Sequence, residues 1–73
     1  MANALYAVVI EGDHWRISHN GQLFDHYPTE AAAVAVARTT AAEAVAAGFD
    51  ARVVVETSGG GFRVEWTGTA APA

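Results

Sequence analysis

Three histidines, His14, His19 and His26, are the side chains of this chain best suited to bind a metal ion. Imidazole nitrogens are common zinc ligands, but a site needs several ligands around one point. His19 and His26 lie on either side of Asn20-Gly21, and in the hairpin that this dipeptide predicts they share a face. At ~3.3 Å per residue they are separated by about 13 Å along the strands. His14 is expected on the opposite face. We therefore predict no metal site and no cofactor.

The carboxylates are the second group that could do chemistry, as general acids or bases. Catalytic carboxyl groups are usually gathered in a pocket. Here Glu11, Asp13 and Asp50 fall in predicted turns. Four others lie on the predicted helix (Glu30 and Glu43) or beside an arginine (Asp25 and Glu56). One helix on one sheet also leaves little room for a cleft of ~300–1,000 Å³. We expect no catalytic residues and a non-enzymatic protein.

Composition excludes several further classes. The chain has 73 residues, a formal net charge of −4 and no cysteine, so disulfides and cysteine-ligated zinc are absent. Nucleic-acid binding needs a basic stripe, which four arginines among eight acids do not provide. No segment approaches the ~20 apolar residues of a membrane span. The start, residues 1–4, has no basic flank and so does not resemble a signal peptide. We expect a cytoplasmic protein without nucleic-acid or membrane partners.

The elements that position these residues begin with three predicted strands. Segment 5–10 is apolar and rich in β-branched residues, and segments 14–19 and 22–27 alternate in polarity. Gly12-Asp13 suits a two-residue turn, and Asn20-Gly21 is a strong hairpin signal. The second turn predicts the pairs His19–Gln22, Ile17–Phe24 and Trp15–His26 on one face, and Ser18–Leu23, Arg16–Asp25 and His14–Tyr27 on the other.

Segment 30–47 predicts the single helix. It is rich in alanine, the best helix former, and contains neither glycine nor proline. Thr29 can cap its N-terminus, where Glu30 suits the helix dipole, and Gly48 can end it. The expected core-facing stripe consists of Val34, Ala37, Ala41, Ala44, Val45 and Gly48.

Segments 51–57 and 62–67 predict a second hairpin around a glycine-rich turn. The turn, 58–61, leads into a strand rather than a helix, which argues against a phosphate-binding loop. A four-residue loop pairs Thr57–Phe62, Val55–Val64 and Val53–Trp66 on one face, and Glu56–Arg63, Val54–Glu65 and Arg52–Thr67 on the other. We expect the core to combine Trp15, Phe24, Val53, Val55, Val64 and Trp66 with the helix stripe.

These elements predict an α+β fold in the order β-β-β-α-β-β. We expect an antiparallel sheet of four to five strands, with the alanine-rich helix packed on one face and the last strand beside the first. Residues 1–67 form a single domain in this prediction, and residues 68–73 form a disordered C-terminal tail.

This arrangement resembles a family of short bacterial domains of unknown function. The resemblance is carried by Trp15, Ile17 and Phe24, the threonine-capped helix ending at Gly48, and the glycine turn before the last strand. It covers roughly residues 5–67, although the turn 59–61 is longer than is usual in the family. The resemblance implies a ββαββ-type fold and a bacterial, phage or archaeal source, but no activity.

The first strand favours an interaction role. Its residues are apolar on both faces, so a central position in the sheet leaves an apolar stripe on the outer face. The residues expected to form an interface are Val8, Val54, Leu23 and Tyr27. We predict a homo-oligomer or a domain that binds another protein. The alternative is a nucleic-acid-associated accessory protein of phage or mobile-element origin.

Overall fold

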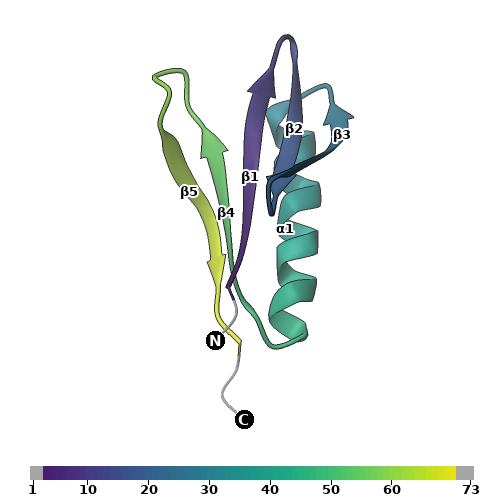
Figure 1. The fold of residues 1–73 in the computed structure, drawn as a ribbon, viewed down its shortest axis with the longest axis vertical. Helices are drawn as coiled ribbons and strands as arrows, with labels where there is room; N and C mark the ends of the chain where they lie inside the picture. Colours follow the sequence, from purple (N-terminus) through teal and green to yellow (C-terminus); the bar gives the residue numbers. More distant parts are fainter. Residues whose placement is uncertain (1–2, 71–73) are drawn as a thin grey trace.

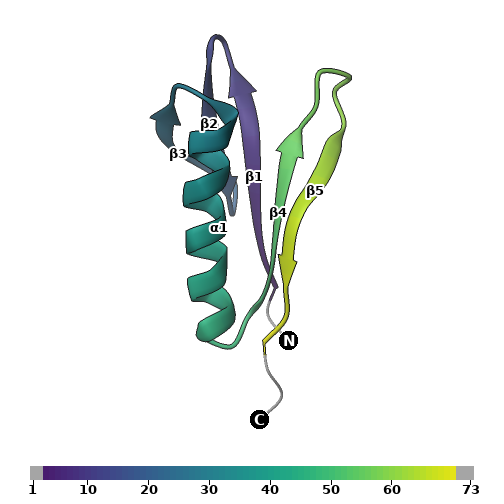
Figure 2. The same ribbon diagram turned by 180° about the vertical axis from the view of Figure 1, so that it is seen from behind.

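The computed structural model describes residues 3–70, which form five strands and one helix (Figure 1). These are β1 (Asn3–Glu11), β2 (His14–His19), β3 (Gln22–Tyr27), α1 (Glu30–Ala46), β4 (Asp50–Glu56) and β5 (Phe62–Gly68). The strands make one sheet in the order β3-β2-β1-β4-β5. Helix α1 lies along one face, as the view from behind also shows (Figure 2). The prediction of an α+β fold with a helix on one face of a single sheet is confirmed.

The sheet is mixed rather than antiparallel. Strands β1 and β4 pair in parallel, and the other neighbours are antiparallel. The predicted antiparallel sheet with the last strand beside the first is therefore wrong. Strand β3 runs in the direction of β1, and α1 returns the chain to the end where both begin, so β4 is parallel to β1. Of the last hairpin, β4 rather than β5 takes the interior place beside β1, because Val53, Val54 and Val55 make β4 apolar on both faces.

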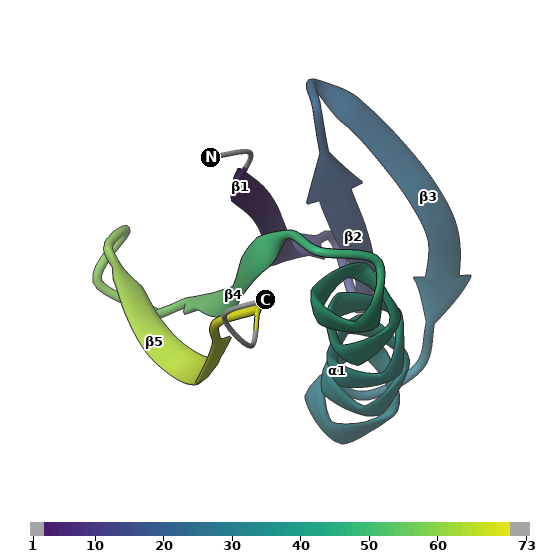
Figure 3. The same cartoon turned by 90° about the horizontal axis from the view of Figure 1, so that it is seen from below.

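The core lies between α1 and the sheet, chiefly against β4 and β1. Val8, Val53 and Val55 are fully buried, and the helix contributes small side chains that let it lie close to these strands. The buried helix residues are Ala33, Val34, Ala37 and Ala41. Viewed from below, β5 projects to one side of the layer that the helix covers (Figure 3).

The predicted core is partly correct. Val53 and Val55 are buried with Val34, Ala37 and Ala41 of the predicted stripe, and Trp15 and Trp66 pack against them while only partly buried. Phe24 and Val64 were expected in the core but are 43% and 56% exposed.

Both ends of α1 form as predicted. The Thr29 hydroxyl accepts a hydrogen bond from the Ala32 N–H at 3.1 Å. At the other end Gly48 has a φ of +101°, and Phe49 N–H donates to the Ala44 carbonyl while Gly48 N–H donates to that of Val45. This pair of bonds is a Schellman motif, which needs the left-handed conformation that glycine supplies.

The first two hairpins follow the predicted turns up to a β-bulge. Asn20 and Gly21 both have positive φ, and His19–Gln22, Ser18–Leu23 and Ile17–Phe24 pair as predicted. The register then shifts around Asp25, whose φ is +49°, so that Trp15 faces Tyr27 instead of His26.

A second bulge interrupts the last hairpin. Val53 pairs with Trp66 and Arg52 with Thr67 as predicted, but Glu65 is skipped and Val54 faces Val64. Beyond the bulge Glu56 faces Phe62, so the connecting loop has five residues, 57–61, instead of four. Because strand residues alternate between faces, this shift moves Phe62 and Val64 away from the helix.

The described chain continues past the predicted domain boundary at residue 67. Gly68 belongs to β5, and the Ala70 N–H donates to Asp50 Oδ1 at 3.1 Å. The prediction of disorder is therefore wrong for residue 68, and residues 71–73 lie outside the described residues. Between residues 3 and 70 no helix is both long and apolar enough to cross a bilayer.

Candidate functional site

The face of the sheet without the helix, here called the open face, carries large exposed apolar side chains. Leu5, Leu23, Phe62 and Val64 are between 45% and 56% exposed. They surround the less exposed Ala7, Val9 and Val54 on the two central strands. The open face is built by alternation: Tyr6 and Val8 of β1 face the helix, and the residues between them face outward.

Two of the four predicted interface residues lie on the open face. Val54 and Leu23 are there, whereas Val8 is fully buried beneath the helix. Tyr27 lies opposite Trp15 and packs against the core. The placements of Val8 and Tyr27 on an outer patch are therefore wrong.

Three exposed residues of the open face were not among the predicted interface residues: Leu5, Phe62 and Val64. The alternation of β5 predicted Phe62 and Val64 on the face of Val53 and Val55, with Val64 in the core, and only the bulge at Glu65 turns them outward. The glycine run before β5 is the one sequence signal for this change of register. A flexible loop permits a connection of four or of five residues, and each length gives a different register.

Charged side chains on the open face follow a simple pattern along β4. Arg52 and Glu56 lie two residues before and two residues after Val54, on the same face. Glu56 Oε1 accepts a hydrogen bond from the Ile10 N–H at 2.9 Å, which ties β4 to β1. Arg52 is exposed and forms no ion pair with any residue from 3 to 70.

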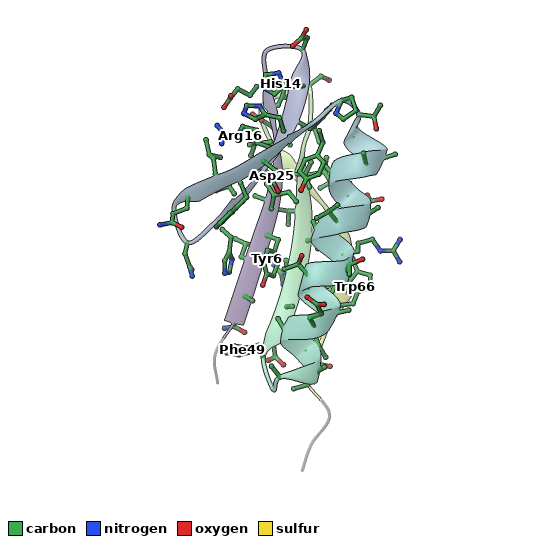
Figure 4. All side chains as sticks on the ribbon, turned by 90° about the vertical axis from the view of Figure 1, so that its right-hand side faces the viewer. Tyr6, His14, Arg16, Asp25, Phe49 and Trp66 are labelled. Atoms are coloured by element: carbon green, nitrogen blue, oxygen red, sulfur yellow. The ribbon has the colours of Figure 1, made fainter. Side chains whose placement is uncertain are left out.

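A second group of polar side chains lies at the tip of the β1–β2 hairpin, next to the end of β3. Glu11, His14 and His26 each place one possible metal-ligating atom within 4.8 Å of the others. The His14 and His26 rings are 4.6 Å apart between centroids. The prediction that these histidines lie on opposite faces is wrong, because the bulge at Asp25 brings His26 to the side of His14. Figure 4 places His14 at the tip, above Arg16.

Hydrogen bonds orient the side chains of this tip. His14 Nδ1 lies 3.1 Å from Asp13 Oδ1, and Arg16 Nη1 lies 3.4 Å from Glu11 Oε2. Arg16 also donates through Nε to the Asp25 carbonyl at 3.0 Å, so the predicted pairing of Arg16 with the Asp25 side chain is replaced by a backbone contact.

The same contacts lower the pKa values of the two acids at the tip. Burial acts to raise the pKa of Glu11, but the contacts with Arg16 and, to a smaller extent, His14 together outweigh it and lower the pKa below its ordinary value. The hydrogen bond from His14 lowers the pKa of the Asp13 carboxyl. The tip therefore carries two carboxylates and one guanidinium.

His19 is separate from this group. Its ring stacks on Tyr6 with centroids 4.3 Å apart, and Nδ1 donates to the Leu5 carbonyl at 3.0 Å. It is a packed histidine with a satisfied nitrogen.

Arg63 also differs from its predicted role. It binds Glu30 of α1 at 2.8 Å and Glu65 at 3.1 Å, instead of pairing with Glu56. The hydrogen bond with Glu30 is the main cause that raises the pKa of Arg63. This arginine therefore links the edge strand β5 to the first turn of the helix.

No protein-family model, no curated protein and no solved structure matches this chain. The resemblance to short bacterial domains of unknown function stays a hypothesis that rests on the sequence pattern alone.

Proposed function

We propose that this protein is a non-enzymatic domain that forms a homodimer through its open face. The supporting observation is the concentration of exposed Leu5, Leu23, Phe62 and Val64 on one side of the sheet. Contiguous exposed apolar side chains usually mark protein contacts. A short chain without cysteine also has few other means of adding to a small core.

The charges on β4 support a second copy as the partner. Two sheets that pack face to face keep their strands within about 30° of each other. We place a two-fold axis in the interface, perpendicular to the strands and crossing β4 near Val54. The strands of the two copies then run in opposite directions. Arg52 of each copy then faces Glu56 of the other, so the surface is self-complementary, as a two-fold contact requires. An axis along the strands would instead bring like charges together.

Sedimentation velocity over a range of concentrations tests this proposal. We expect the wild-type protein to be dimeric at tens of micromolar, and Val64→Lys to be monomeric because the new charge would be buried between the sheets. The matched control is Val36→Lys, since Val36 is 41% exposed on α1, on the other side of the sheet. A monomeric wild-type protein, or a Val64→Lys variant that dimerises like Val36→Lys, would contradict the proposal.

The alternative, a nucleic-acid-associated protein, has weaker support from the charges. Arg16 and Arg63 are engaged by carboxylates, which leaves few free cations to neutralise phosphates. A salt-sensitive shift of the protein on DNA or RNA in a gel would favour that alternative over the dimer.

A further inference from the structure

The hairpin tip brings together three side chains of types that bind zinc, two imidazoles and one carboxylate. The ligand atoms of Glu11, His14 and His26 lie within 4.8 Å of one another. A zinc ion at about 2.0–2.1 Å from each atom needs them ~3.3 Å apart. Glu11 and His14 already lie 3.5 Å apart, between Oε1 and Nε2. His26 is exposed at the end of β3, so a small rotation of its side chain closes the remaining gap.

His14 is oriented as a metal-binding histidine is. A carboxylate can only accept a hydrogen bond, so the contact with Asp13 places the ring proton on Nδ1 and leaves the Nε2 lone pair free. Nε2 is shielded from solvent and forms no hydrogen bond with any residue from 3 to 70; the nearby Glu11 Oε1 lies 3.5 Å away. Metal-bound histidines typically donate their other nitrogen to a carboxylate in this way.

Glu11 is oriented as well. Its Oε2 is held by Arg16, which is itself anchored by the backbone carbonyls of Leu23 and Asp25. The second oxygen, Oε1, is the one that faces His14 Nε2. Together with Asp13, these side chains give the tip a net charge of −1, which suits a cation.

We propose that this tip binds a divalent transition-metal ion, with zinc as the ion to test. The ligands are Nε2 of His14, a ring nitrogen of His26 and Oε1 of Glu11, and Asp13 is a positioning residue that orients His14. Two imidazoles and one carboxylate favour zinc over calcium or magnesium, which prefer all-oxygen sites. Three protein ligands leave a coordination position open for water or for a group from another molecule.

Calorimetric titration of the metal-free protein with zinc chloride tests the site. We expect one zinc ion per chain, and at least ten-fold weaker binding by either His14→Gln or His26→Gln. Asp13→Asn should weaken binding about 10–100-fold, because an outer carboxylate fixes the ring nitrogen that binds. His19→Gln is the matched control and should bind zinc like the wild type, since His19 packs on Tyr6 outside the tip.

Proton NMR of the imidazole rings gives a readout that is independent of the substitutions. One equivalent of zinc should shift the ring resonances of His14 and His26 and leave those of His19 in place. Three outcomes would overturn the proposal: no heat of binding at millimolar zinc, unchanged affinity in His26→Gln, or equal shifts of all three histidines.

Discussion

A single residue, Asp25, brings the ring of His26 next to that of His14. Its φ of +49° creates the bulge that turns His26 toward the hairpin tip, where the two rings are 4.6 Å apart. Aspartate and asparagine tolerate this left-handed conformation better than other residues with a side chain, whereas β-branched residues do so poorly. The identity of residue 25 therefore affects both the local strain and the arrangement of the tip.

Replacing Asp25 tests this link. We expect Asp25→Val to lower the free energy of unfolding by about 1–3 kcal/mol, because valine is strained at positive φ. Asp25→Asn keeps the tolerance for this conformation and is the control, with an expected change within ±0.5 kcal/mol. Urea unfolding measures both, and equal stability of the two variants would show that residue 25 bears no such strain.

The sequence predicts the turn next to this bulge but not the bulge itself. Asn20-Gly21 determines three residue pairs because both residues adopt positive φ in a two-residue turn. Asp25 carries a weaker signal: aspartate is depleted in strands and tolerant of positive φ, but it also occurs in regular strands. The proximity of Glu11, His14 and His26 was not predicted for this reason, since the face assignments of β3 beyond residue 24 shift by one.

At the scale of elements, the edge strand β5 is joined to the helix by an aromatic ring that covers a glycine. A Cβ atom at Gly68 would lie 2.6 Å from Trp66 Cη2 and 3.1 Å from Val45 Cγ2. The absence of a side chain at residue 68 thus makes room for the indole next to Val45. Arg63 adds a second link from the same strand to Glu30 of α1.

Gly68→Ala should displace the indole of Trp66 from this position. We expect a loss of about 1–3 kcal/mol in the free energy of unfolding, as is typical of an overpacked site. Tryptophan fluorescence should change with it. Gly59→Ala is the matched control, because Gly59 has open space around it and no positive φ. If the two variants unfold at the same urea concentration, the packing of the Trp66 ring does not depend on the absence of a side chain at residue 68.

The elements themselves were predictable, whereas their order in the sheet was not. The caps at Thr29 and Gly48 are local signals, and they place both ends of α1 correctly. Which strand of the last hairpin lies beside β1 depends on contacts between residues more than 40 positions apart, as in the pairing of Tyr6 with Val53. The run Val53–Val55 indicates that β4 is the strand beside β1, since a strand that is apolar on both faces suits an interior position in a sheet.

At the scale of the whole molecule, the two faces of the sheet differ in what covers them. The helix buries one face with small side chains, and the two bulges decide what the other face presents. The bulge in β5 adds Phe62 and Val64 to the open face, and the bulge in β3 adds His26 to the hairpin tip. Both proposed binding surfaces therefore depend on irregularities in the edge strands, where bulges are most common.

The proposed two-fold contact makes a prediction about charge that a nonspecific apolar contact does not make. Arg52 and Glu56 would face each other across the dimer twice, so reversing one of them places like charges in both positions. Arg52→Glu should raise the dimer dissociation constant roughly ten-fold, since each exposed pair is worth about 0.2–1 kcal/mol and two pairs change sign. Adding Glu56→Arg to this variant should restore dimerisation, because the swapped charges are again complementary about the axis. The measurement is sedimentation at low salt, where these charges are least screened.

Glu56→Arg also removes the hydrogen bond to the Ile10 N–H, so the comparison that matters is the affinity of the double variant against that of Arg52→Glu alone. A double variant that dimerises no better than Arg52→Glu would exclude this axis, even if the open face forms the interface.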